Sequence, residues 1–381
     1  MTDAKPPAQP SPSQLFSPIR LRSLELANRI VVSPMCQYSA VDGCATAWHT
    51  VHLGQLALSG AGLLMVEATA VEPIGRIGPG CLGLYDDACE TALAGVLAAL
   101  REVSPMPLAI QLAHAGRKGS SARPWEGGQL IGADAGGWQP VAPSAVPHLE
   151  AEPPPRALTR ADLDALTARF ADATERASRL GFDALELHCA HGYLLHEFLS
   201  PLANLREDDW GGSLENRMRY PLEVCAAVRA AWPAHKPLGV RVSATDWVDG
   251  GWDLPSTIEF ARRLRGLGVD WIDASSGGAS PKQRIALGPG YQVPFAEAIR
   301  REVGIPVIAV GLITEPQQAE DIVAGGKADM VALARGLLYD PRWPWHAAAA
   351  LGASVEAPRQ YWRSQPGGNR QLFGSTSFGM R

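Results

Sequence analysis

Short apolar runs, rich in β-branched residues and bounded by glycine or proline, recur eight times along the chain. The hydrophobic positions within a run are continuous and do not alternate with polar ones, which is typical of strands buried on both faces. The runs cover Arg29–Pro34, Leu63–Val71, Pro107–Ala113, Ala184–Cys189, Pro237–Ala244, Trp271–Ser275, Pro306–Leu312 and Met330–Ala334. We therefore expect eight buried strands.

Helical patterns fill the intervals between these runs. Thr159 and Asp162 have the spacing of a capping box, and the apolar residues that follow recur every three or four positions, as on one face of a helix. Those residues are Leu163, Leu166, Phe170, Ala173 and Ala177. Further helices are expected over Ala88–Val103, Ser213–Trp232, Pro255–Gly268, Phe295–Val303, Pro316–Ala324 and Pro341–Leu351. Strands and helices alternating to a count of eight predict an α/β fold, a single (β/α)8 TIM barrel.

One connection is far longer than the roughly 2–6 residues usual in α/β units. Residues 114–158, between the third strand and its helix, are rich in Pro, Gly and Trp. A loop at that position falls on the catalytic face of a barrel, so a long capping loop after strand 3 is expected. We expect residues 1–14 to form a disordered leader without a secretory signal, 15–363 the barrel, and 364–381 a C-terminal tail.

A doubly wound sheet is the competing fold. Residues 78–83 do spell the G-x-G-x-x-G pattern of a dinucleotide-binding turn. The pattern lies well past the end of its strand and contains Pro79. The acidic residue that would bind the ribose, expected after the next strand, is also missing. We interpret it as an ordinary loop.

Composition narrows the possible partners and the compartment. Hydrophobic residues make up 46% of the chain, and the formal net charge is −5. Without a basic stripe the chain is a poor candidate for nucleic-acid binding, and no apolar run approaches the ~20 residues of a membrane span. The six cysteines form no C-x-x-C pair, which favours reduced thiols in a cytoplasmic protein over disulfides or a zinc site.

Polar residues collect where the predicted strands end, which is where a barrel places its chemistry. At the seventh and eighth strand ends, Gly311 permits close backbone approach and Arg335 offers a forked cationic donor. Barrels often bind phosphate between these two loops. The sequence therefore predicts a phosphate site there.

The fourth strand ends in a histidine pair followed by a tyrosine. His188 and His191 have H-x-x-H spacing, but no acidic or cysteine cluster accompanies them and H-E-x-x-H is absent. We therefore assign no metal site and interpret them as neutral donors to a substrate oxygen, with Tyr193 as a proton source. A metal-dependent barrel hydrolase that uses the two histidines is the alternative.

Taken in order, the strand-end motifs resemble the Old Yellow Enzyme family of FMN-dependent ene-reductases, in its cysteine-containing bacterial branch. The resemblance rests on residues 26–38, 67–71, 111–118, 188–193, 210–217, 240–243, 310–311 and 333–335, and it spans roughly 15–363. Related barrels that carry an iron–sulfur cluster fit less well, because no cysteines follow Cys225.

The resemblance implies non-covalent FMN at the mouth of the barrel. The implied flavin contacts are Ser33, Pro34, Met35, Cys36, Ala68, Gln111, Arg241, Gly311, Ala334 and Arg335. Among them, Arg241 would stabilise the anionic reduced flavin, and Gly311, Ala334 and Arg335 would hold its phosphate.

The family mechanism implied for this chain is ping-pong. NADPH or NADH would reduce FMN, which would then reduce the activated C=C bond of an α,β-unsaturated carbonyl compound or a nitro compound. His188 and His191 would bind the substrate oxygen and Tyr193 would protonate the α-carbon. Tyr38 would add a substrate contact, and Cys36 would modulate the flavin and the substrate fit.

A segment near the C-terminus also resembles the family. Residues 360–363 match the segment with which this branch reaches into a neighbouring subunit. The resemblance implies a homodimer or a dimer of dimers, with Arg363 entering the neighbouring substrate site.

Overall fold

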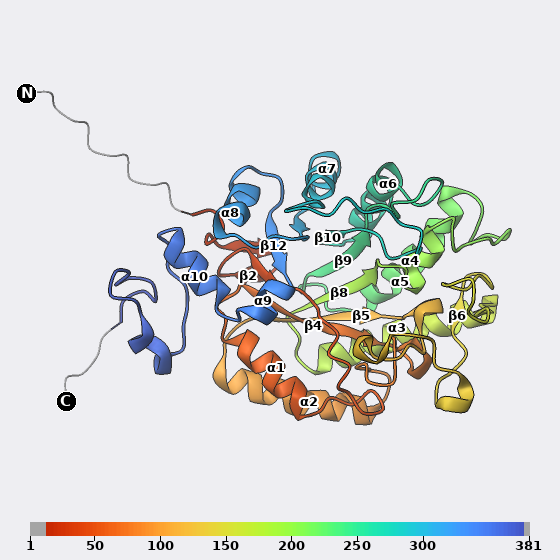
Figure 1. Cartoon of the computed structure of the whole chain (residues 1–381), viewed down its shortest axis with the longest axis horizontal. Helices are drawn as coiled ribbons and strands as arrows, with labels where there is room; N and C mark the ends of the chain where they lie inside the picture. Colours follow the sequence, from red (N-terminus) through yellow and green to blue (C-terminus); the bar gives the residue numbers. More distant parts are fainter. Residues whose placement is uncertain (1–12, 377–381) are drawn as a thin grey trace, which may run out of the picture.

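The computed structural model describes residues 13–376 and contains a closed barrel of eight parallel strands (Figure 1). Around the closed barrel the strands follow the order β10-β11-β12-β3-β4-β5-β8-β9. Starting from β3, this is their order along the chain. Their bounds are β3 (Ile30–Val32), β4 (Leu63–Ala70), β5 (Leu108–Ala113), β8 (Ala184–Cys189), β9 (Leu238–Ser243), β10 (Trp271–Ser275), β11 (Val307–Ala309) and β12 (Met330–Leu333). Each strand falls within one of the eight predicted runs, so the predicted TIM barrel is confirmed.

Helices surround the barrel, with α1 and α2 on one side and α6 and α7 on the other (Figure 1). They are α1 (Ala47–Ala57), α2 (Asp87–Val103), α3 (Arg160–Arg179), α4 (Leu194–Leu199), α5 (Leu214–Ala231), α6 (Leu254–Gly266), α7 (Val293–Val303), α8 (Pro316–Ala324), α9 (Arg335–Tyr339) and α10 (Trp343–Ala350). The predicted capping box at α3 is present, since Thr159 and Asp162 exchange side-chain and backbone hydrogen bonds. All five apolar residues predicted for its inner face are buried.

The sequence patterns missed α1, α4, α9 and the hairpin β1 (Ile19–Leu21) and β2 (Leu24–Leu26). Leu21 and Leu26 of this hairpin pack with Trp271 and Met330 in the interior of the barrel. The hairpin therefore closes the end of the barrel opposite the C-terminal ends of the strands. Gly239 on β9 leaves the space that the Trp271 indole fills, because a Cβ there would overlap the ring.

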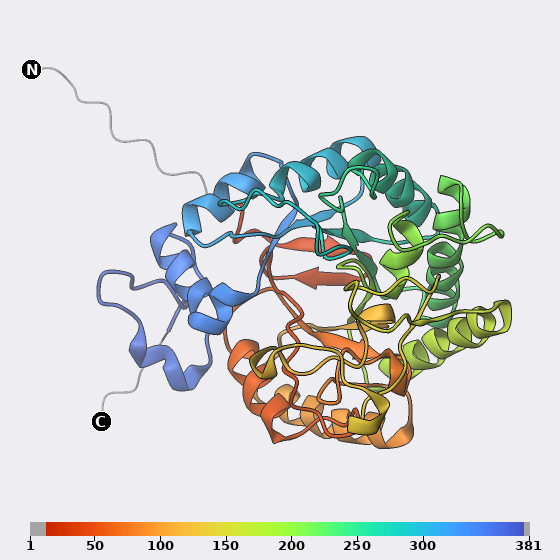
Figure 2. The same ribbon diagram turned by 45° about the vertical axis from the view of Figure 1, so that its right-hand side comes forward.

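The long connection after β5 packs against other mouth loops. It contains the 3-10 segments η2 (Gly116–Lys118), η3 (Pro124–Glu126) and η4 (Ala133–Ala135), and a parallel pair of short strands, β6 (Val141–Ala142) and β7 (Arg156–Ala157). Figure 2 shows this yellow segment between the orange and green parts of the barrel. The Arg117 guanidinium donates to the carbonyl of Ala279, which follows β10, at 2.6 Å. The loop is thus tied across the mouth, as predicted for a cap.

The C-terminal segment packs outside the barrel, beside α10 (Figure 2). It includes η5 (Arg359–Ser364), and Leu372 and Phe373 are buried against Trp345. Part of the predicted tail is therefore packed on the barrel. The rest of that tail, 377–381, and most of the predicted leader, 1–12, lie outside the described residues. The G-x-G-x-x-G stretch is a loop, and Gly80 lets it close on the backbone of Tyr38.

Candidate active site

His188 lies at the end of β8 with only 4% of its surface exposed. Its Nδ1 accepts a hydrogen bond from the backbone N–H of Ala190 at 3.2 Å. Burial, followed by the positive charge of Arg241, holds the pKa of His188 well below its usual value. The ring is therefore neutral, and because Nδ1 is an acceptor, Nε2 carries the hydrogen.

A tight turn after β8 positions the second histidine. His191 and Gly192 both have positive φ, +62° and +69°. The His191 N–H donates to Ser243 Oγ at 2.9 Å, and its Nε2 lies 2.7 Å from Ser275 Oγ. Left-handed backbone at a non-glycine residue persists only where the surroundings hold it, and here two serine hydroxyls at the ends of β9 and β10 do so.

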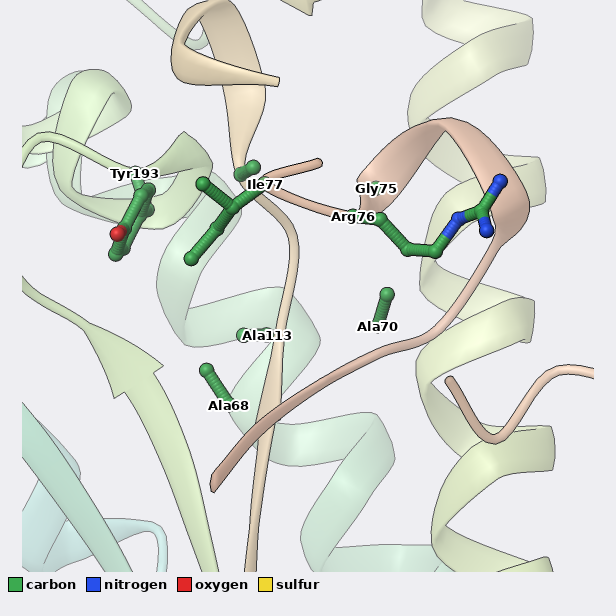
Figure 3. A pocket seen from close by; sticks show the side chains of 8 residues that line it. Ala68, Ala70, Gly75, Arg76, Ile77, Ala113 and Tyr193 are labelled. Atoms are coloured by element: carbon green, nitrogen blue, oxygen red, sulfur yellow. The ribbon is translucent and has the colours of Figure 1, made fainter. Parts of the chain in front are cut away.

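Tyr193 completes an aromatic cluster with the two histidines. The His188 ring lies 5.1 Å from both the His191 and the Tyr193 rings, edge to face in each case. Burial raises the pKa of Tyr193 well above its usual value, so the phenol keeps its proton. Figure 3 shows Tyr193 beside Ile77 over Ala68 and Ala113, around a pocket of about 10 Å³, room for about one water.

The loop after β3 brings Cys36 and Tyr38 to the same mouth. Burial, and then the negative charge of Glu67, raise the pKa of Cys36, so it is a thiol and not a thiolate. The Glu67 carboxylate accepts the backbone N–H of Gln37 at 3.1 Å. Tyr38 packs edge to face on Trp125 of the capping loop, at 5.7 Å between ring centroids. The capping loop thus contacts Tyr38, which was predicted to bind the substrate.

The predicted flavin residues also collect at the strand ends. Ser33 and Gln111 are buried, Pro34, Met35 and Cys36 are half-buried, and Ala68 follows a bulge in β4. Ser33 Oγ and Arg241 Nε are two of the buried side-chain atoms within residues 13–376 that have no hydrogen-bond partner, although Arg241 Nε lies 3.4 Å from Asp273 Oδ2. Buried polar atoms of this kind call for an explanation such as a bound ligand.

The residues predicted to bind phosphate lie just after β11 and β12. Gly311 has φ +121°, which only glycine adopts readily, and the side chain of Arg335 is exposed. Burial raises the pKa of Tyr291, while Arg335 and then Arg241 act to lower it. The positive charges of both arginines therefore act on Tyr291. This donor set fits FMN, which needs hydrogen bonds at its ring edge and a cation at its phosphate.

The structure adds site residues that the sequence patterns missed. Glu186 accepts a hydrogen bond from Gln111, and Asp273 lies 3.4 Å from Arg241. His196 Nε2 lies 3.0 Å from Asp246 Oδ1, both with fully buried side chains. For Glu186 and Asp273 the sequence signal was a charged residue inside an apolar strand run, ALELHC and WIDAS, and Asp246 was an acidic residue near a strand end.

Metal ligation finds no support in the part of the chain described. Within residues 13–376 no group of three or more His, Cys, Asp or Glu side chains could hold a metal ion. His188 and His191 instead contact Ala190 and Ser275. The alternative of a metal-dependent hydrolase is therefore not favoured.

Comparison with known proteins identifies the family. The model of the NADH:flavin oxidoreductase / NADH oxidase family matches residues 14–353. The chain belongs to this family. It is 46% identical over 351 residues to an NADPH dehydrogenase of Geobacillus thermodenitrificans, a match that covers 92% of this chain and 98% of that protein. It is 41% identical over 366 residues to an NADH:flavin oxidoreductase of Gibberella zeae, covering 91% and 88%.

Solved structures agree with this family assignment. Morphinone reductase superposes with a TM-score of 0.74 at 29% identity, covering 91% of this chain and 92% of that one. An Old Yellow Enzyme homologue from Zymomonas mobilis shares the fold, with a TM-score of 0.73 at 24% identity and coverage of 95% and 100%. The predicted Old Yellow Enzyme family is thereby confirmed. The protein is an NADPH-dependent FMN oxidoreductase. Between residues 13 and 376, no helix is long and apolar enough to cross a membrane.

Proposed function

We propose that this oxidoreductase reduces activated C=C bonds, those of α,β-unsaturated carbonyl compounds and of nitro compounds, in a ping-pong reaction. FMN, when bound, supplies the redox chemistry by taking a hydride from NADPH or NADH and passing it to the substrate that replaces the nicotinamide. The chain itself must bind the substrate oxygen, provide a proton, and exclude water.

The observation that carries the proposal is the cluster of His188, His191 and Tyr193. His188 is neutral with its hydrogen on Nε2, the arrangement needed to donate to a carbonyl oxygen without giving up a proton. Tyr193 lies against the His188 ring with its phenol protonated, so it is placed to protonate the carbon next to that carbonyl. Neutral donors suit a substrate whose oxygen gains negative charge during the reaction.

The surrounding residues would hold the cofactor. The residues assigned to FMN are Ser33, Pro34, Met35, Cys36, Ala68, Gln111, Arg241, Gly311, Ala334 and Arg335. Their support is the buried Ser33 Oγ, which has no hydrogen-bond partner, the positive φ of Gly311 after β11, and the exposed Arg335 after the neighbouring strand β12. Tyr38 and Cys36 would border the substrate, under the cap that Trp125 helps to form.

A visible absorption spectrum tests the proposal. The purified protein should show a flavin band that bleaches on anaerobic addition of NADPH and returns when 2-cyclohexenone is added. A flavin band that bleaches but is not restored by enones or nitroalkenes would refute the substrate class alone. The absence of a flavin band after incubation with FMN would refute the cofactor site.

The oligomer is a second proposal. We infer a homodimer, or a dimer of such dimers, in which Arg363 reaches the substrate site of the neighbouring subunit. Its support is the family resemblance of residues 360–363 and the exposed position of Arg363 on η5. Arg363→Ala should raise the KM for the enone without changing the mass measured by light scattering. A monomeric wild-type protein would overturn the proposal. A cytoplasmic location stays a prediction.

A further inference from the structure

A layer of polar side chains fills the barrel directly beneath the mouth. It consists of Gln111, Glu186, Arg241 and Asp273, which we call the interior polar layer; the four are between 0% and 7% exposed. They lie on consecutive strands, with Gln111 paired to Glu186 across β5 and β8, and Arg241 paired to Asp273 across β9 and β10. TIM barrel interiors are usually filled by branched apolar residues, so a charged layer needs a reason.

Within the layer, Glu186 and Asp273 contact the two members proposed to bind the flavin, Gln111 and Arg241. Gln111 Nε2 donates to Glu186 Oε1 at 2.7 Å, and Trp271 Nε1 donates to Glu186 Oε2 at 3.3 Å. Arg241 Nε lies 3.4 Å from Asp273 Oδ2. The carboxyl groups of Glu186 and Asp273 therefore fix the amide of Gln111 and the guanidinium of Arg241 from below.

The charges in the layer do not balance when all of its groups are ionised. Two carboxylates face one guanidinium, which leaves one negative charge sealed inside the barrel. Burial, and then the charge of Asp273, raise the pKa of Glu186 to about 8, while Arg241 acts against this rise. Burial also raises the pKa of Asp273, again opposed by Arg241. With a proton on the pair, the layer is neutral at pH 7.

We propose that Glu186 and Asp273 are positioning residues beneath the flavin, and that the pair binds one proton whose occupancy follows the charge at the mouth. The inference rests on the proposed placement of FMN next to Gln111 and Arg241. Negative charge added above the layer offsets the positive charge of Arg241 and so raises the proton affinity of the two carboxylates beneath it. The layer then takes up a proton from solvent.

The proton count follows from this arrangement. Two electrons and one proton convert bound FMN to its anionic reduced form, and any second proton goes from solvent to the Glu186 carboxylate. Below about pH 7 Glu186 already carries its proton, so reduction takes up one proton per two electrons. Above about pH 8 Glu186 is ionised before reduction, and reduction should take up two.

The experiment is a potentiometric titration of the FMN-loaded protein between pH 6 and pH 9.5. The slope of the midpoint potential against pH gives the protons taken up per two electrons. Wild type should change from one to two near pH 8, and Glu186→Gln should stay at one. In Asp273→Asn the change should begin at lower pH, because a negative charge next to Glu186 is gone. Glu197→Gln, which replaces another buried carboxyl with a pKa of about 8, should behave as wild type.

The positioning role has its own readout in FMN affinity. Glu186→Ala leaves the buried Gln111 amide without its acceptor and should raise the Kd for FMN roughly tenfold. Glu186→Gln restores an acceptor oxygen and should bring the Kd back to near the wild-type value.

Several outcomes would overturn the inference. One outcome needs no variant: a wild-type slope that corresponds to one proton per two electrons at every pH. Another is a slope that corresponds to two protons above about pH 8 in Glu186→Gln. Equal FMN affinity in Glu186→Ala and wild type would remove the positioning role. Wild-type protein that binds no FMN would instead contradict the proposed function, so the two failures are distinguishable.

Discussion

At the scale of single residues, protonation states decide what the site can do. His188 and His191 are held neutral, and the Tyr193 phenol keeps its proton, in each case mainly because the group is buried. A neutral imidazole N–H and a phenol can both donate hydrogen bonds at pH 7, and neither group carries a charge that water would have to solvate. The cluster is therefore suited to an uncharged substrate that becomes anionic as it reacts.

Tyr193→Phe removes the proposed proton donor and keeps the ring that packs on His188. The half-reaction with 2-cyclohexenone should slow by about 10²–10⁴-fold, the range of general acid catalysis. Reduction of the flavin by NADPH should change little, because it requires no proton from this side chain. Stopped-flow absorbance measures the two half-reactions separately. Equal slowing of both would mean that Tyr193 is not the selective proton donor.

Replacing both His188 and His191 with Ala removes the proposed donors to the substrate oxygen. The affinity for phenol, measured by spectral titration of the oxidised protein, should weaken by about 10²-fold or more. Each lost donor to a charged oxygen is worth about 1.5–3 kcal/mol. Enone turnover should fall as well, with the flavin still bound. Unchanged enone kinetics would remove both residues from the mechanism.

At the scale of elements, helix α4 supports the turn that carries the cluster. His196 in α4 accepts the Gly192 N–H on its Nδ1 at 2.8 Å, so its Nε2 carries the hydrogen; this atom lies 3.0 Å from Asp246 Oδ1. Asp246 also accepts the Ser200 hydroxyl at 2.6 Å and the Trp252 N–H at 2.8 Å. A buried carboxylate thus connects the loop after β9 with the backbone between His191 and Tyr193.

Asp246→Ala should therefore disturb both stability and the turn. Leaving the buried His196 and its neighbours without an acceptor should cost about 3 kcal/mol in the free energy of unfolding, measured with urea. Phenol affinity should fall too, because Gly192 lies between two cluster residues. Asp246→Asn keeps one acceptor oxygen and should give smaller effects on both. Full phenol affinity in a destabilised Asp246→Ala protein would show that α4 does not position the cluster.

Local patterns could be predicted from the sequence, and pairings across the barrel could not. The capping box of α3 and the eight strand runs depend on residues close together in the chain. Helix α1 was missed because its buried face includes His49 and His52, while Trp48 and Val51 are exposed, which reverses the usual pattern. Glu186 and Asp273 come close enough to interact electrostatically only when the barrel closes, so no spacing in the sequence connects them.

At the scale of the whole molecule, buried ionisable groups make stability depend on pH. Glu186 and Glu197 have pKa values of about 8 against an ordinary 4.5, so the folded state holds protons that the unfolded chain releases. Their contribution is fully present below pH 4.5 and is lost as the pH rises through 8. His52 and His148, with pKa values of about 4 against 6.5, act oppositely, and their contribution is complete above pH 6.5.

The melting temperature should therefore fall between pH 6.5 and pH 8, where only the buried carboxyls still change. Just above pH 8 the fall should end, because the buried carboxyls are by then ionised in both the folded and the unfolded state. Lys118, with a pKa of about 8 against an ordinary 10.5, adds stability as the pH rises further, because only the unfolded chain keeps that proton. Differential scanning calorimetry of the FMN-loaded protein measures the profile. Glu197→Gln should make the fall shallower, and the exposed Glu25→Gln should leave it unchanged. A melting temperature that rises from pH 6.5 to 8 would mean that these carboxyls are ionised in the folded protein, so their burial would have to be offset by water or by a cation inside the barrel.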